Sequence, residues 1–397
     1  MMVDFEKTET PKLPLFNLAF RPFFLGAGIF AVLSLALWSA IYLFNLQLPI
    51  ESISITQWHA HEMLYGYAMA VVAGFLLTAI KNWTGVQTLY GKPLMGLFIL
   101  WLIPRILFFA GTSFLPLAAI IDILFSVLFL VAASLPIIKA KQWKQITIVS
   151  KIALLVLGNI FFYLGAFQQL DNGIFWGIYG GLYLLLGLVL VMGRRVIPFF
   201  IEMGVGYKVT VFNAKWLDIT GLVLFIGFFV VEILLQQQTL SAFFAIGLFI
   251  ANATRLVGWH THGIWKKSLL WSLYVSFWFI TFGFLLLALS RFTNVSQYLA
   301  IHAFTVGGIG LLTMGMMARV SLGHTGRDIS NPPKMVAYAL VILLVSAVIR
   351  VIVPLFNLID YSLLIGLSQL LWIISFLMFA MTYLPILAKA RIDGRFG

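Results

Sequence analysis

Apolar stretches alternate with short polar segments along almost the whole chain. Each stretch is close to the roughly 20 residues that an α-helix needs to cross a bilayer. Twelve such stretches lie at residues 22–46, 58–80, 94–111, 114–138, 150–168, 174–193, 213–236, 239–259, 269–290, 298–318, 335–357 and 361–387. Helices are expected because the open edge of a β-sheet cannot satisfy its backbone groups in lipid. The pattern therefore predicts an all-α polytopic membrane protein, a bundle of transmembrane helices in contact with the lipid bilayer.

The composition excludes a soluble domain. Hydrophobic residues make up 62% of the 397 positions and charged residues only 10%, which is too few to cover a globule of this size. The chain has no cysteine, so disulfide bonds, thiolate metal sites and cysteine catalysis are excluded as well. We expect residues 1–397 to form a single integral membrane domain.

The net charge of +12 is explained by where the basic residues lie. Lysine and arginine gather in every second loop, and the loops between them hold only Arg291. This asymmetry follows the positive-inside rule and predicts that both termini are cytoplasmic. No nucleic-acid partner is needed to account for the charge. In a bacterium such a multi-pass protein lies in the inner membrane.

Two imperfect echoes suggest that the domain contains two six-helix halves. The segment Arg195-Val196-Ile197-Pro198-Phe199-Phe200 resembles Arg21-Pro22-Phe23-Phe24, and a Trp-His-x-His motif occurs at residues 58–61 and again at 259–262. The first motif opens its helix and the second closes its helix, so a simple parallel repeat would not superpose them. The predicted halves are residues 1–193 and 213–390, joined by a cytoplasmic loop.

The candidate chemistry lies with histidine. All six histidines are at or near helix ends, and the predicted topology sorts them into an outer group and an inner group of three: His59, His61 and His302, then His260, His262 and His324. Imidazole is the commonest protein ligand for iron and copper, so two clusters on opposite sides of the bilayer favour metal ligation. The alternative is a transporter in which His, Glu and Arg side chains relay protons or bind a metal cargo.

The outer group has a geometric constraint. In a regular helix His59 and His61 point about 200° apart, so they cannot both bind one ion. Glu62 and a run of small residues are expected on the His59 side, forming a stripe flat enough for another helix or a planar macrocycle. Below His302, Gly307 and the glycines that follow it would leave room for a ring. The candidate cofactor-binding residues are His59, His61, His302, Glu62 and Gly307.

The inner group has softer neighbours. His260 and His262 follow the end of a helix, and His324 lies in a Gly-x-Thr-Gly loop, with Met316 and Met317 nearby in the sequence. Imidazole and thioether together suit copper better than magnesium or calcium. The alternative is that His260 and His262 are ordinary interfacial residues.

Several charges fall inside the predicted spans. Arg105 and Asp122 are expected to pair, because an unpaired charge there would cost several kcal/mol. Asp218, Glu232, Arg255 and Arg350 are likewise expected to be paired or to reach the interface rather than to react.

Several motifs together resemble the NnrS family. They are Arg21-Pro22-Phe23-Phe24, Trp58-His59-Ala60-His61-Glu62-Met63, Leu77-Thr78-Ala79 leading to Asn82-Trp83-Thr84-Gly85, Arg194-Arg195 with Pro198-Phe199-Phe200, and the segment from Gly315 to Gly326. The resemblance covers nearly the whole chain. It implies a twelve-helix bacterial membrane protein that carries haem and copper and acts in the nitric oxide response, denitrification and nitrosative stress resistance.

The resemblance extends to a comparison with haem-copper oxidases, where histidines on helices 2 and 10 hold one haem near the outer face. His59, His61 and His302 occupy the matching helices here, whereas helices 6 and 7 contain no histidine, so the oxidase copper ligands have no counterpart. We therefore expect haem at the outer histidines, copper at the inner ones, and nitric oxide or a nitrosyl species as ligand. Catalysis and the electron donor are left open.

Overall fold

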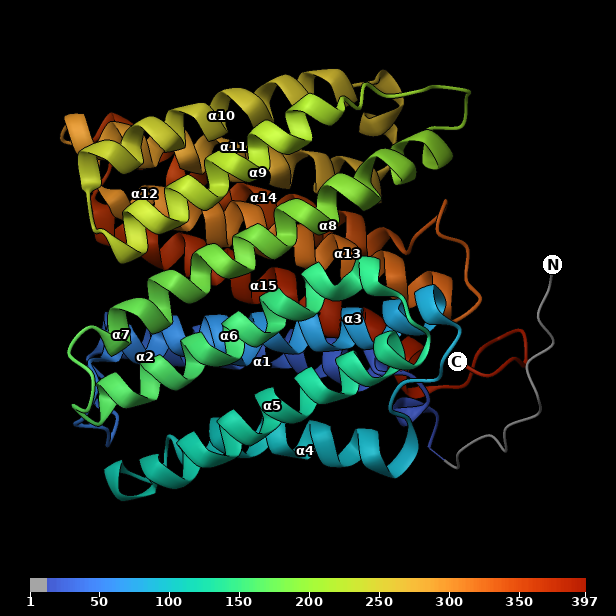
Figure 1. Cartoon of the computed structure of the whole chain (residues 1–397), viewed down its shortest axis with the longest axis horizontal. Coiled ribbons are helices and arrows are strands. Elements are labelled where there is room, and N and C mark those ends of the chain that lie inside the picture. The colour runs from blue at the N-terminus through green and yellow to red at the C-terminus, as the bar shows by residue number, and fades with distance from the viewer. Residues whose placement is uncertain (1–12) are drawn as a thin grey trace.

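The computed structural model describes residues 13–397. Over this part of the chain the helices form twelve long spans and no strand occurs. Figure 1 shows that the spans run roughly side by side. The predicted all-α polytopic architecture is confirmed. The first residues, where the cytoplasmic N-terminus was predicted, lie outside the described part.

Eight of the spans are single helices and four are composite. The single helices are α1 Phe20–Phe44, α4 Gly91–Leu107, α5 Leu115–Lys139, α6 Ile146–Ala166, α10 Gln238–Trp259, α11 Ser268–Phe292, α14 Lys334–Val351 and α15 Tyr361–Ala388. The composite spans join α2 Ile55–His61, η2 Glu62–Ala68 and α3 Met69–Thr84; α7 Gly173–Phe175, η5 Trp176–Gly180 and α8 Gly181–Gly204; α9 Lys215–Phe229 and η6 Val230–Leu234; and α12 Gln297–His302, η8 Ala303–Gly310 and α13 Leu311–His324.

Each composite span contains one π-helical segment, namely η2, η5, η6 or η8. A π-helical turn bonds residue i to i+5 and so holds one residue more than an α-helical turn, which shifts every side chain beyond it around the axis. The π-helical turn also weakens the regular backbone hydrogen bonding, and side chains from other spans donate hydrogen bonds to some of its carbonyl oxygens. The Trp101 indole donates to Gly66 O at 2.9 Å, and the Tyr65 hydroxyl donates to Gly177 O at 2.7 Å.

Eleven of the twelve spans are long and apolar enough to cross a membrane. The exception is α4, whose 17 residues reach about 26 Å at 1.5 Å per residue, slightly less than the roughly 30 Å of a hydrocarbon core. In Figure 1 it lies at the edge of the bundle beside α5. The central spans are more enclosed. In Ile55–Thr84, 78% of the most apolar stretch is buried inside the protein, and in Gln297–His324 the share is 72%.

The charges inside the spans are paired as expected in three cases. Arg105 Nη2 lies 2.6 Å from Asp122 Oδ1. Asp218 contacts Arg194 at 3.0 Å and Arg255 at 3.1 Å, and Glu232 contacts Arg291 at 2.7 Å. The ion-pair prediction is therefore confirmed for these groups.

The bundle has two ends, the Arg21 end and the His302 end. At the Arg21 end, the Arg21 guanidinium donates to Leu387 O and Lys389 O at 2.7 Å and to Gly397 O at 2.6 Å, so the start of α1 holds the segment after α15. At the His302 end lie α2, α7 and α12, on the left of Figure 1. Which end faces the cytoplasm, and the division into halves 1–193 and 213–390, stay predictions.

Candidate functional site

A cavity of about 430 Å³ lies at the His302 end, and His59 and His302 both line it. Its walls come from α1, the composite spans α2–η2, η5–α8 and α12–η8, and the helices α14 and α15, and most of the lining is apolar. The volume falls within the range of roughly 300–1,000 Å³ that is usual for small-molecule sites. The structure thus brings together two of the three outer histidines, and we call this space the outer cavity.

His302 has one ring nitrogen fixed by the backbone. Its Nδ1 lies 2.6 Å from the carbonyl oxygen of Tyr298, one turn earlier in α12, and must donate its proton there. The lone pair is then on Nε2, whose partner is Arg350 Nη2 at 3.3 Å. A histidine that donates through one nitrogen to a backbone carbonyl is oriented for metal binding through the other.

His59 is held by stacking. Its ring lies parallel to Trp38 of α1, with centroids 4.4 Å apart and planes 8° apart. Nδ1 of His59 is buried and has no hydrogen-bond partner among the described residues. The helix that carries it starts at a capping box, in which Ser54 and Gln57 bond each other's backbone N–H. His59 therefore has a fixed position and an unused nitrogen.

Arg350 departs from the sequence expectation. Its side chain is only 9% exposed and lines the outer cavity, yet no carboxylate within residues 13–397 pairs with it. Its contacts are the Tyr361 hydroxyl at 2.8 Å and His302 Nε2. A buried cation inside a membrane protein is costly without an anion. The outer cavity therefore combines an apolar body with one positive charge that lacks a counter-ion.

His61 and Glu62 do not reach the outer cavity. Both are fully buried in a separate cluster with Arg105, Asp122 and Asn159. Glu62 Oε1 lies 3.0 Å from His61 Nδ1, and Glu62 Oε2 lies 3.1 Å from Arg105 Nε. The structure thus places the predicted ligands His61 and Glu62 in a buried charge network.

The hydrogen bonds of this network use both ring nitrogens of His61. The Asn159 amide nitrogen donates to Asp122 at 2.9 Å, so its oxygen faces His61 Nε2 at 3.0 Å. Nδ1 of His61 is taken up by Glu62 on the other side of the ring. Because both nitrogens already have partners within the protein, neither is free to bind a metal in this arrangement.

The glycine surface below His302 is filled rather than open. A Cβ built on Gly307 would come within 2.3 Å of the Phe279 ring, and one on Gly310 within 2.5 Å of Trp372. These glycines allow η8 to pack closely against α11 and α15. The predicted role of Gly307 in making room for a macrocycle is therefore not supported, because a side chain occupies that room.

At the Arg21 end the inner histidines divide into a pair and a single residue. The His260 and His262 ring centroids are 5.6 Å apart, and both residues are exposed. His324 instead packs on Phe20, with centroids 5.6 Å apart. No group of three or more His, Asp or Glu side chains within residues 13–397 is placed to hold a metal ion. The structure therefore does not assemble the expected three-histidine set, and Met316 lines a separate apolar cavity.

The loop that precedes α9 fixes the histidine pair. The Tyr207 hydroxyl accepts a hydrogen bond from Gly263 N at 2.9 Å and bonds the Thr261 hydroxyl. These two bonds lower the pKa of the Tyr207 phenol, because they stabilise its ionised form. His260 Nε2 accepts a hydrogen bond from the Trp265 indole at 3.1 Å, so one of the four ring nitrogens of His260 and His262 already has a partner.

Sequence reasoning missed the residues that shape the outer cavity. Tyr298 and Tyr361 open two of the predicted spans, where an aromatic residue is most simply an interfacial anchor, and Trp38 lies well inside a third. No pattern in the sequence set these three residues apart from the other aromatic residues.

One comparison with known proteins identifies the chain. No curated protein sequence matches it. The model of the family described as NnrS protein matches residues 14–391, which includes both histidines of the outer cavity and nearly every described residue. The chain belongs to the NnrS family.

Proposed function

We propose that the protein binds haem in the outer cavity, with His302 and His59 as iron ligands, and acts in the response to nitric oxide. Membership in the NnrS family supports a role in that response. The observation that carries the haem proposal is that two imidazoles from separate spans line one largely apolar cavity.

The residues present fit this group. His302 presents a lone pair on Nε2 because Nδ1 donates to Tyr298, and His59 has an unpaired buried nitrogen. Arg350 now uses the lone pair of His302. A ring carboxylate would offer the guanidinium the anion that it lacks, and would leave His302 free for iron. The protein's own part is to orient both imidazoles, balance the carboxylates and exclude water.

Bound haem would supply an iron able to take up nitric oxide or exchange electrons. We extend the proposed function to denitrification and to resistance to nitrosative stress. For copper, His260 and His262 remain the candidate ligands, because they are the inner histidines that lie together. We propose a bacterial inner-membrane location from the basic loops of the sequence.

The test is the visible spectrum and metal content of purified protein. A Soret band is expected in the wild type, and it should be lost or shifted to a five-coordinate form in His302→Ala and in His59→Ala. His260→Ala/His262→Ala is the matched control: its haem should be unchanged and its copper should fall. An unchanged Soret band in His302→Ala would refute the axial assignment.

A further inference from the structure

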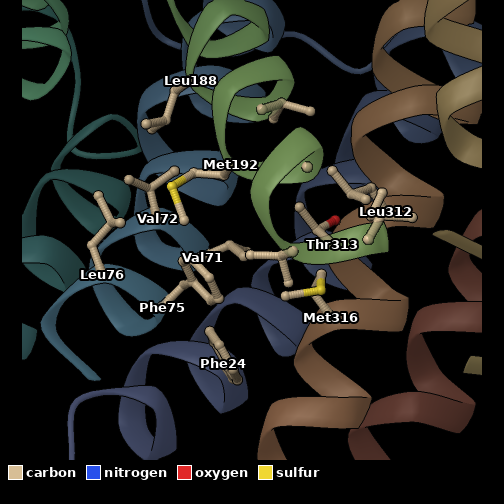
Figure 2. A pocket seen from close by; sticks show the side chains of 14 residues that line it. Phe24, Val71, Val72, Phe75, Leu76, Leu188, Met192, Leu312, Thr313 and Met316 are labelled. Carbon is tan, nitrogen blue, oxygen red and sulfur yellow. The ribbon is translucent and has the colours of Figure 1, made fainter. Parts of the chain in front are cut away.

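A second cavity lies one helical turn further into the protein than the outer cavity. Its volume is about 90 Å³, and its walls come from α1, α3, α8 and α13. Figure 2 shows that the side chains around it are aliphatic, aromatic or thioether groups, and that the Thr313 hydroxyl is the one oxygen among them. We call this space the inner apolar cavity.

The two cavities are stacked along the same three spans. Ala68 lines the outer cavity and Val72 the inner one; Leu185 lines the outer cavity and Leu188 the inner one. On the third span Ile309 and Thr313 have the same relation. Residues three or four apart lie on one face of a helix. Each span therefore contributes consecutive turns of one face to both cavities.

A single hydrogen bond joins the walls between them. Tyr67 lines the outer cavity, Thr313 lines the inner one, and their hydroxyl oxygens are 2.6 Å apart. Thr313 Oγ1 also lies 2.6 Å from the carbonyl of Ile309 and donates to it, so the Tyr67 phenol is the donor to Thr313. None of the described residues that line the inner apolar cavity carries a charge.

We propose that the inner apolar cavity holds a small uncharged molecule of the size of a diatomic gas, and that the Tyr67–Thr313 bond separates it from the outer cavity. A charged or strongly hydrated ligand would find no partner there, whereas an enclosed apolar cavity of about 150 Å³ is known to stay dry and to take up xenon or benzene. The link to the outer cavity rests on the proposed function, because that is where haem is proposed to bind.

Xenon is the probe, because it is uncharged and detected without haem. A structure of the full chain determined under xenon pressure should show one xenon atom among Val72, Met192 and Leu312. Val72→Phe fills this space and should abolish the xenon site. Val127→Phe places the same ring at a 37% exposed position of α5 and should leave the site occupied. No xenon in the wild type, or a lipid chain in its place, would overturn the proposal.

The separating role is tested by Tyr67→Phe, which removes the hydroxyl and keeps the ring. In haem-loaded protein this variant should change the fraction of carbon monoxide that rebinds after photolysis, and an unchanged fraction would refute the role. If the protein binds xenon but contains no haem, the proposed function is refuted and the gas site is supported. If haem-loaded protein binds no xenon, the gas site is refuted and the proposed haem site is supported.

Discussion

Two histidines in one short motif have opposite surroundings. His59 lines the outer cavity, whereas His61, two positions later, is enclosed in a network of charges. The sequence predicted their divergence, because residues two apart in a helix point about 200° apart. It did not predict which partner each would find. Arg105 and Asn159 come from other spans, and only the packing of those spans places them against His61.

The buried network should respond strongly to the loss of one charge. Arg105→Met removes the guanidinium that contacts both Glu62 and Asp122, and we expect it to lower the free energy of unfolding by about 3–5 kcal/mol. Denaturant unfolding of purified protein in detergent measures this. Arg105→Lys keeps the charge and should lose less, whereas equal loss in both variants would mean that geometry matters here and charge does not.

At the scale of elements, the π-helical segments explain where sequence reasoning failed. Most boundaries could be predicted from the hydrophobic pattern, and residues 13–397 form twelve helical spans where twelve were expected. The prediction that the sixth span ends at residue 193 was wrong, because α8 continues through Arg194, Arg195 and Pro198 to Gly204. The predicted small-residue stripe assumed a regular α-helix through residues 59–74. The π-helical turn in η2 instead keeps Met63 and Tyr67 on the outer cavity and turns Gly66 toward Phe30. No local composition marks that extra residue per turn.

The side chains that satisfy π-helical carbonyls should matter for stability. Tyr65→Phe removes a buried side-chain hydrogen bond to Gly177 O and leaves that carbonyl with the Gly181 N–H as its partner, which costs about 0.5–1.5 kcal/mol. A lower midpoint of thermal unfolding is expected. The matched control is Tyr338→Phe on α14, where the side chain is 61% exposed and the change should be negligible. Equal midpoints for the two variants would show that the η2–η5 contact carries no stability.

At the scale of the whole molecule, the stacked cavities and the paired charges all depend on a single transmembrane topology of the chain. The alternation of basic and neutral loops predicts that topology, and the helices alternate in direction as it requires. Gln142 follows α5 and Asn172 precedes α7, so α6 separates them by its full length, and both are exposed.

This arrangement is open to a direct test, since the chain has no cysteine of its own. A single cysteine at Gln142 should react with a membrane-impermeant thiol reagent only from the cytoplasmic side, and one at Asn172 only from the opposite side. Labelling of both from one side would contradict the twelve-span topology. Reversed labelling would keep the spans and invert the predicted orientation.

The pairing of Arg105 with Asp122 has a consequence for how the protein is made. Alone, α4 is short and carries an arginine that is costly to bury in lipid without an anion. One of its two carboxylate partners, Glu62, is on the span made before α4, and the other, Asp122, is on α5, the next helix to leave the ribosome. We expect the translocon to release α4 only once both neighbours can contact it, which makes the three spans a single unit of biogenesis.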